Sequence, residues 1–229
     1  MKVFLPCRAG SQRILQKNTR DFAGNKKGLL GHKLEQLIRC DEIDGIVVST
    51  NDPEVMSIAL SMSSAKITID NRPEDLCSNN ASTDQLIKYA VSLFSDEHFL
   101  WTHVTCPFFD DTHYAKAIAK YFECLADNTY DSLMGVKKIQ TFLWNQDGPM
   151  FDRSQLKWPF TQLINPIYEV DSTIFIINSE LSKAENDRIG NKPFMFENDD
   201  ISSFDIDYPS QFTSAEKLQL INDMNPIDK

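Results

Sequence analysis

The sequence predicts an α/β fold in which helices cover both faces of a mostly parallel sheet. Short β-rich segments alternate with helical segments, 41% of the residues are hydrophobic, and the chain is 229 residues long. Alternating strands and helices favour parallel pairing, because each helix returns the chain to the same end of the sheet. A chain of this length can bury one full core, so we expect a single domain over residues 1–229.

Local patterns locate the expected elements. Runs of aliphatic and β-branched residues, beginning with Val3-Phe4-Leu5, predict strands at residues 2–5, 45–49, 66–69, 99–104, 131–136, 173–178 and 203–207. Apolar residues at helical spacing predict helices at residues 28–40, 82–94 and 210–224. Asp52 as N-cap and Pro53 as first helical residue begin another helix. A further helix, capped by Asp111 or Thr112, is expected to end near residue 125.

Residues 137–170 interrupt the alternation of strands and helices. They show little helical periodicity and contain three sets of turn signals, Asn145-Gln146-Asp147-Gly148-Pro149, Trp158-Pro159 and Asn165-Pro166. We therefore expect an inserted arm over residues 137–170.

Charge is distributed unevenly along the chain. The formal net charge is −10, although residues 1–27 hold seven basic residues and one acidic residue. Nucleic-acid binders usually present a basic surface, so the overall charge argues against nucleic acid as a partner. A local cationic segment in an acidic protein favours a small anionic ligand instead.

Cysteine spacing and hydropathy bound the cellular setting. The five cysteines include no Cys-x-x-Cys pair, which indicates reduced, buried thiols and neither a zinc site nor a disulfide framework. No apolar run approaches the roughly 18 residues of a membrane span. The first apolar run ends before Arg8 and is too short for a signal peptide. We expect a cytoplasmic protein with no membrane partner.

The loop after the first strand combines charge with backbone freedom. Arg8, Arg13 and Lys17 supply positive charge, Gly10 allows a close backbone approach, and Ser11 adds a hydroxyl. Ligands of parallel sheets bind beyond the carboxyl ends of the strands, where this loop lies. The loop therefore suits a triphosphate, although neither common phosphate motif is present and a solvated basic loop is the alternative.

A pair of acidic residues near the C-terminal end is the second candidate site. In an extended Phe204-Asp205-Ile206-Asp207, the two apolar side chains face the core while Asp205 and Asp207 share the other side. Two neighbouring carboxylates suit Mg2+, which binds one or two carboxylates together with phosphate oxygens. A merely solvated acidic edge is the alternative.

The first loop resembles the signature of the acylneuraminate cytidylyltransferase family. The similar residues are Arg8-Ala9-Gly10-Ser11-Gln12-Arg13 with Lys17-Asn18, followed by Phe22-Ala23-Gly24, by Val47-Val48-Ser49-Thr50-Asn51-Asp52 and by Arg72-Pro73-Glu74 with Ala81-Ser82. The resemblance spans nearly the whole chain. It implies a Rossmann-like nucleotidyltransferase fold and transfer of CMP from CTP to the anomeric hydroxyl of an acidic keto-sugar, with release of pyrophosphate.

The resemblance also implies roles for the two candidate sites. Arg8, Lys17, Asp205 and Asp207 would be catalytic, and the two aspartates would hold Mg2+ as the family's Asp-x-Asp. The implied nucleotide-binding residues are Arg8, Gly10, Ser11, Arg13, Lys17, Asn18, Arg72 and Ser78, with Asn79 nearby.

Sugar recognition is where the chain departs from the family pattern. His103 stands for the glutamine that touches the sugar, in a segment that also contains Thr105, and Tyr168 matches a family tyrosine. Glu169 replaces an arginine that could bind a sugar carboxylate, and Gln12 replaces a lysine. These departures leave the sugar undetermined.

The arm resembles the family's dimerisation segment, which implies a homodimer. Trp144, Trp158 and Phe160 are its candidate apolar anchors, and packing within the arm is the alternative for them.

Two other functions stay open from the sequence. One is transfer from another nucleoside triphosphate to a sugar phosphate, and the other is nucleotide binding without catalysis. No Gly-x-Ser-x-Gly motif supports a hydrolase of that type.

Overall fold

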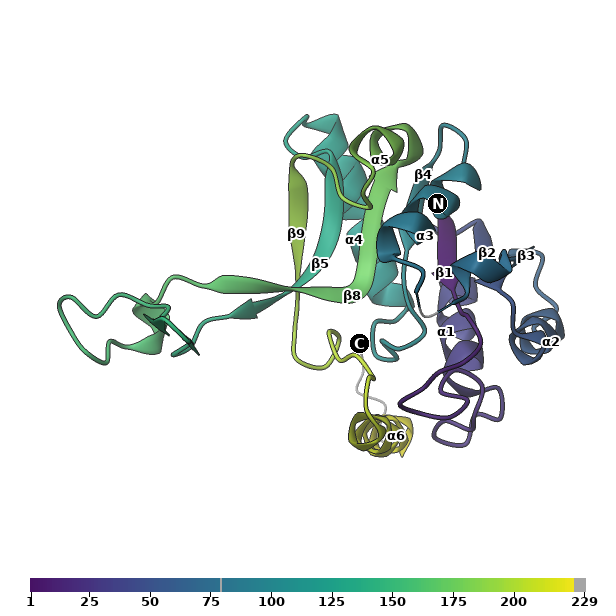
Figure 1. Cartoon of the computed structure of the whole chain (residues 1–229), viewed down its shortest axis with the longest axis horizontal. Coiled ribbons are helices and arrows are strands. Elements are labelled where there is room, and N and C mark those ends of the chain that lie inside the picture. Colours follow the sequence, from purple (N-terminus) through teal and green to yellow (C-terminus); the bar gives the residue numbers. More distant parts are fainter. Residues whose placement is uncertain (79, 225–229) are drawn as a thin grey trace.

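A seven-stranded sheet forms the centre of the computed structural model, which describes residues 1–78 and 80–224. Its strand order is β3-β2-β1-β4-β8-β5-β9. The strands are β1 (Lys2–Pro6), β2 (Gly45–Thr50), β3 (Ile67–Asn71), β4 (His98–Trp101), β5 (Ser132–Ile139), β8 (Ile167–Asn178) and β9 (Pro193–Asn198). Strand β8 is antiparallel to both of its neighbours, and the other pairings are parallel. The mostly parallel α/β sheet is thus confirmed (Figure 1).

Helices cover both faces of this sheet. They are α1 (Gly28–Arg39), α2 (Pro53–Ser61), α3 (Thr83–Ser92), α4 (Asp111–Ala126), α5 (Ser179–Glu185) and α6 (Pro209–Met224), with short 3-10 helices η1 (Glu74–Leu76) and η2 (Thr161–Leu163). Because side chains alternate along a strand, Val3 and Leu5 of β1 face one side and Phe4 faces the other.

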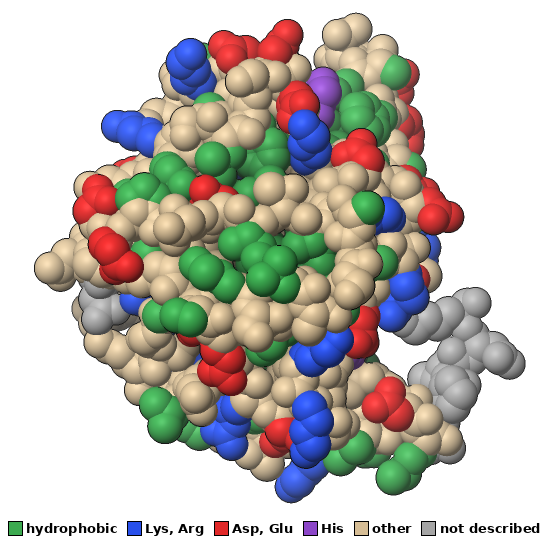
Figure 2. Space-filling model, turned by 90° about the vertical axis from the view of Figure 1, so that its right-hand side faces the viewer, with side chains coloured by type: hydrophobic (Ala, Val, Ile, Leu, Met, Phe, Trp, Pro, Cys, Tyr) green, Lys and Arg blue, Asp and Glu red, His purple; other side chains and the backbone are tan. Residues whose placement is uncertain are grey.

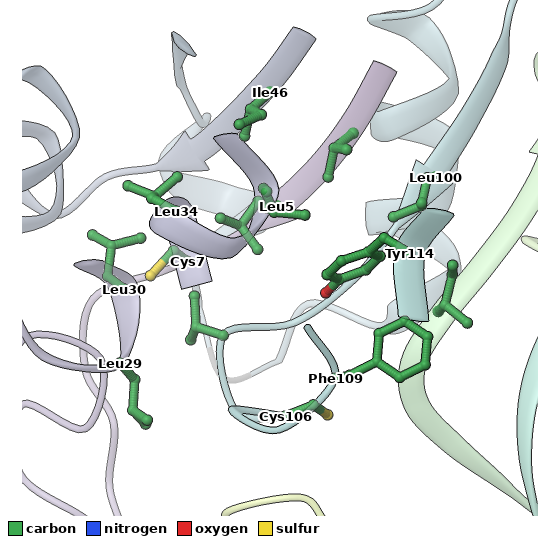
Figure 3. Packing of buried hydrophobic residues seen from close by; sticks show 14 of the residues in the cluster. Leu5, Cys7, Leu29, Leu30, Leu34, Ile46, Leu100, Cys106, Phe109 and Tyr114 are labelled. Carbon is green, nitrogen blue, oxygen red and sulfur yellow. The ribbon is translucent and has the colours of Figure 1, made fainter. Parts of the chain in front are cut away.

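Each face of the sheet has its own apolar core. Val3 and Leu5 pack with residues of α1, α2, α4 and α6, and part of this larger core is seen in Figure 3. Phe4 packs with α3 and with Trp101 and Phe175, and Leu181 of α5 lies against the same cluster.

Several expected boundaries differ in the structure. Residues 203–207 form no strand, because their backbone bonds to the preceding turn, to a loop and to a lysine rather than to a neighbouring strand. Strand β4 ends at Trp101 rather than at residue 104, and α4 is capped by Asp110 instead of Asp111 or Thr112. Neither β9 nor the seven-residue helix α5 was expected from the sequence.

The inner strands β5 and β8 continue beyond the sheet into an arm that projects from the body of the molecule (Figure 1). Beyond a register shift between Met134 and Val136, β5 continues to pair with β8 as far as Ile139 opposite Ile167. The tip holds a two-stranded ribbon, β6 (Trp144–Asn145) and β7 (Gly148–Pro149). Division of the chain into a single domain with an arm of 137–170 stays a prediction.

The arm tip has its own aromatic cluster. The Trp158 ring centre lies 5.2 Å from that of Phe142 and 6.2 Å from that of Phe151. Trp144 also contacts Phe151, which is buried. Phe160 is 74% exposed. Internal packing therefore involves both tryptophans, whereas the structure gives Phe160 no aromatic neighbour among the described residues.

The surface charges, the cysteines and the helix lengths can be compared with the composition of the chain. Charged side chains of both signs are interspersed over the face at the β3 edge of the sheet (Figure 2). All five cysteines are free and buried. Within residues 1–78 and 80–224, no helix is both long enough and apolar enough to cross a bilayer.

Candidate active site

The loop after β1 lines a cavity at the carboxyl edge of the sheet. The cavity has a volume of about 290 Å³ and is lined by Pro6, Arg8, Ser11, Gln12, Arg13, Ile14, Lys17, Asn18, His103, Val104, Thr105 and Asp207. Gly10 lines a smaller neighbouring cavity, which shares Arg8, Ser11, Lys17 and Asn18 with the first. The structure thus gathers all the residues of this loop that the sequence singled out.

Backbone contacts with the next strand set the shape of the loop. The Cys7 N–H donates to the Ser49 carbonyl at 2.9 Å, and the Ala9 N–H donates to Asn51 Oδ1 at 3.0 Å. Gly10 has a φ of 82°, a left-handed conformation that favours glycine. Asn51 was not singled out as a site residue, although its place directly after β2 is a signal that sequence reasoning could have used.

The basic side chains of the loop meet one acidic residue. Arg13 Nη2 lies 3.4 Å from Asp207 Oδ1, and Lys17 Nζ lies 3.8 Å from the same oxygen. Burial lowers the pKa of Lys17, while Asp207 and Asp205 act in the opposite direction. Arg8 is half-buried and donates to the Cys77 carbonyl at 3.2 Å. Lys17 also donates to Ile206, so residues about 190 positions apart in the chain meet in one site.

The backbone between the two aspartates is held from both sides. The Ile206 N–H donates to the Thr105 carbonyl at 2.9 Å, and Lys17 Nζ donates to the Ile206 carbonyl at 2.9 Å. Ile206 itself is buried in the core, which agrees with the expected inward direction of this side chain. Gln211 Oε1, unexpected from the sequence, accepts from the Asp207 N–H at 2.8 Å.

Asp205 has an oxygen that lacks a partner. Its Oδ1 atom is buried and accepts no hydrogen bond from any residue in the described part of the chain. Asp205 and Asp207 both line a second cavity of about 310 Å³, and Asp207 also lines the first. Among the described residues, no group of three or more His, Cys, Asp or Glu is arranged to hold a metal, so a cation bound by these two carboxylates would need its other ligands from phosphate oxygens or water.

His103 contributes an uncharged ring to the wall of the first cavity. Burial lowers the pKa of His103 to about 3, and the positive charges of Arg188, Lys17 and Arg72 act in the same direction. Trp101 Nε1 donates to His103 Nε2 at 2.9 Å. Because Nε2 accepts a hydrogen bond, the ring hydrogen belongs on Nδ1, and the neutral imidazole can donate from that atom.

Of the other two residues expected to contact the sugar, one lines this cavity and one does not. Thr105 lines it. Tyr168 lies on the stem of the arm, donates to Glu197 Oε1 at 3.3 Å, and lines neither of the two cavities that contain Asp207. A role of Tyr168 toward a sugar stays a prediction.

Arg72 and Ser78 lie beside the loop rather than in the cavity. Arg72 is buried and donates from Nη2 to the Ser49 carbonyl at 2.7 Å and from Nε to Ser49 Oγ at 3.1 Å. Ser78 is exposed and donates to the Asp75 carbonyl. Their contact with a pyrimidine stays a prediction, and Asn79 lies outside the described residues.

The family model of the cytidylyltransferases matches residues 3–226. The chain belongs to the cytidylyltransferase family. The resemblance stated from the first loop is thereby confirmed, and curated relatives agree with it.

Three relatives of this chain have names that state an activity. An N-acylneuraminate cytidylyltransferase of Escherichia coli is 25% identical over 98% of this chain and 53% of its own length. This chain thus spans about half of that relative. A pseudaminic acid cytidylyltransferase of Campylobacter jejuni is 24% identical over 80% of this chain and 73% of the relative. A CMP-N,N'-diacetyllegionaminic acid synthase of Legionella pneumophila is 28% identical over 95% of both chains.

Solved structures share the fold of this cytidylyltransferase-family chain. A CMP:2-keto-3-deoxy-manno-octonic acid synthetase complexed with CTP has a TM-score of 0.64 at 15% identity, over 96% of this chain and 98% of that one. A 4-diphosphocytidyl-2C-methyl-D-erythritol synthase of Anaerococcus prevotii has a TM-score of 0.68 at 13% identity, over 95% of both chains. At these identities the likeness concerns the fold alone.

Proposed function

We propose that the chain transfers CMP from CTP to the anomeric hydroxyl of an acidic keto-sugar and releases pyrophosphate. The observation that supports it is the meeting of the basic loop after β1 with Asp207 at the carboxyl edge of the sheet. Membership of the cytidylyltransferase family favours CTP as the donor. The names of the relatives from three organisms, which refer to neuraminate, pseudaminic acid and legionaminic acid, favour a sialic acid-like acceptor.

The first loop binds the triphosphate in this proposal. Arg8, Arg13 and Lys17 neutralise phosphate charge, and Ser11 and Asn18 line the same cavity with a hydroxyl and an amide. The backbone at Gly10 lets the loop pass close to the phosphates. Such a transfer needs alignment and charge neutralisation more than covalent chemistry from the protein.

Asp205 and Asp207 are the proposed Mg2+ ligands. Their fit rests on the buried Asp205 Oδ1 atom without a hydrogen-bond donor, since a buried oxygen of this kind is costly unless a cation or donor satisfies it. When bound, Mg2+ supplies Lewis-acid polarisation of a phosphate oxygen. The clamp on the Ile206 backbone fixes the two carboxylates relative to Lys17 before any ligand arrives.

The other protein groups orient the two substrates. Lys17 lies within reach of both Asp207 and the cavity, so it can hold the departing pyrophosphate while the acceptor hydroxyl approaches from the other side. His103 stays uncharged at physiological pH and can donate one hydrogen bond to a sugar oxygen. Thr105 adds a hydroxyl at the same wall.

Pyrophosphate release tests this function. The four nucleoside triphosphates are each supplied with Mg2+ and with eight- and nine-carbon keto-sugar acids, and the nucleotide-sugar product is identified by mass. We expect release only with CTP and with at least one acid. Selective turnover of UTP or GTP would indicate another nucleotidyltransferase, and CTP binding without release would indicate a non-catalytic relative.

Substitution of Asp207 tests the metal assignment. We expect Asp207→Asn to keep its fold, because the side chain is partly exposed, and to lose at least about a hundredfold in turnover, equivalent to about 3 kcal/mol. Asp111→Asn is the matched control, since Asp111 also pairs with an arginine, at 3.0 Å, but lies outside the cavity. Undiminished turnover of Asp207→Asn would refute the assignment.

A further inference from the structure

The guanidinium group of Arg188 is held by two aromatic rings and forms no ion pair with a carboxylate in the described part of the chain. Its Cζ atom lies 3.8 Å from the ring centre of Phe175 and 5.5 Å from that of Trp101, on the α3 and α5 side of the sheet. Among residues 1–78 and 80–224, no side chain forms an ion pair or hydrogen bond with this guanidinium. Burial lowers the pKa of Arg188, and Asp187 opposes this shift. Stacking on ring faces leaves the N–H edges of a guanidinium available.

The same aromatic stack leads to the wall of the first cavity. Trp101, which contacts Arg188, donates its indole N–H to His103 at 2.9 Å, and His103 lines the cavity. The Trp101 and His103 ring centres are 6.0 Å apart. Arg188 is also the charge that most lowers the pKa of His103, ahead of Lys17, which itself lines the cavity. The charge of Arg188 therefore acts where a sugar would meet His103.

Other cations around the cavity already have partners. Arg13 and Lys17 pair with Asp207 and lie in the loop assigned to the phosphates. Arg72 is buried and donates to Ser49. A further anionic group in the cavity thus needs a separate cation, because an acidic keto-sugar adds a carboxylate to the charge of the triphosphate.

The second cavity is unsuited to that carboxylate. Its carboxyl groups outnumber its single lysine, Lys137, which already pairs with Asp200 at 2.7 Å. The acidic residues of its lining are Glu169, Asp171, Asp200, Asp205 and Asp207. Like charges would repel a substrate carboxylate from this side and direct it toward His103.

We infer that Arg188 binds the carboxylate of the keto-sugar beside His103 and thereby selects acidic sugars. This inference rests on the proposed function. A planar guanidinium can bind a carboxylate through two parallel hydrogen bonds, and the stack on Phe175 and Trp101 fixes the plane in advance. Arg188 would thus bind the sugar carboxylate, which Glu169 on the arm cannot bind because its own side chain is negatively charged.

The test compares one keto-sugar acid that turns over with its carboxamide, which has nearly the same shape and no charge. We expect the wild-type chain to prefer the acid by at least about a hundredfold in kcat/KM, as for a site built around a polar group of its substrate. Arg188→Met should remove most of this preference through KM for the acid, while KM for CTP stays within about twofold. Arg20→Met is the control, since Arg20 also stacks on a ring, that of Phe212 at 4.9 Å, but this ring has no part in the Trp101 contacts that connect Arg188 to His103.

Each outcome separates the inference from the proposed function. Absence of pyrophosphate release with every acid refutes the proposed function itself. Turnover with equal use of acid and carboxamide by the wild-type chain, or an unchanged preference in Arg188→Met, refutes the role of Arg188. If thermal melting shows that Arg188→Met does not fold, Arg188→Lys is used instead. This variant keeps the charge but loses the paired hydrogen bonds, so the preference for the acid should fall about tenfold. An unchanged preference in Arg188→Lys refutes the inference.

Discussion

Lys33 of α1 is fully buried and supports the segment that leads to the cavity. Its Nζ atom donates to the Phe109 carbonyl at 2.7 Å and lies 5.0 Å from the ring centre of Tyr114. Nearby on the same helix, Gln36 donates to the Pro107 carbonyl at 2.7 Å. These bonds hold the chain between β4 and α4, which carries His103 and Thr105 into the site. Burial lowers the pKa of Lys33 to about 7, although the charge of Asp111 acts in the opposite direction.

This buried lysine predicts a pH dependence of stability. The unfolded chain keeps the Lys33 proton up to its ordinary pKa of 10.5, whereas the folded chain releases it near 7. The unfolded state therefore binds more protons between these values, so the free energy of unfolding rises with pH in that interval. Relative to Lys33→Met, we expect the wild-type value to rise by about 1 kcal/mol per pH unit from pH 7 to 9. Urea unfolding at three pH values measures the difference, and parallel curves would contradict it.

Some functional residues could be identified from the sequence, and others could not. Asp205 and Asp207 could be found because two carboxylates separated by one apolar residue form a local pattern. Lys33 and Arg188 could not, because their importance depends on contacts with Phe109 and with the Trp101 and Phe175 rings, which are distant in sequence.

At the scale of elements, the apolar runs of β1 and β2 made these strands predictable, since both are buried in the sheet. The segment 203–207 has a similar pattern, yet its partners are the Thr105 carbonyl and Lys17, so it forms no strand. Strand β9 begins at a proline and gains its place by pairing with β5, about sixty residues earlier in the chain. Such long-range pairing leaves little trace in local sequence.

Exposed apolar rings on the arm, of which Phe160 is the most exposed, lead us to expect that the chain forms an oligomer. Phe160 is 74% exposed, Trp158 63% and Leu163 73%, and several exposed apolar residues gathered on one segment favour an interface with a second copy. We expect a homodimer whose dissociation constant rises at least about tenfold in Phe160→Asp, measured by analytical ultracentrifugation. The control is Leu60→Asp, because Leu60 is 70% exposed on α2, in the body of the molecule. A monomeric wild-type chain, or an unchanged constant in Phe160→Asp, would contradict the proposal.

At the scale of the whole molecule, the parallel sheet brings together segments from both ends of the chain. The loop after β1 lies at the carboxyl edge, and the chain returns there before α6 to place Asp205 and Asp207 beside it. Parallel topology made this edge the predictable place for a ligand. The wall of the cavity at His103 was less predictable, because the ring of His103 accepts from Trp101, which in turn contacts Arg188, a residue distant in sequence.

A crystal structure of the chain with Mg2+ and a non-hydrolysable CTP analogue tests the central claim most directly. We expect the triphosphate to lie against Arg8, Arg13 and Lys17, and carboxylate oxygens of Asp205 and Asp207 to bind the metal at about 2.1 Å. A triphosphate bound away from the loop after β1, or a metal bound without either aspartate, would contradict it.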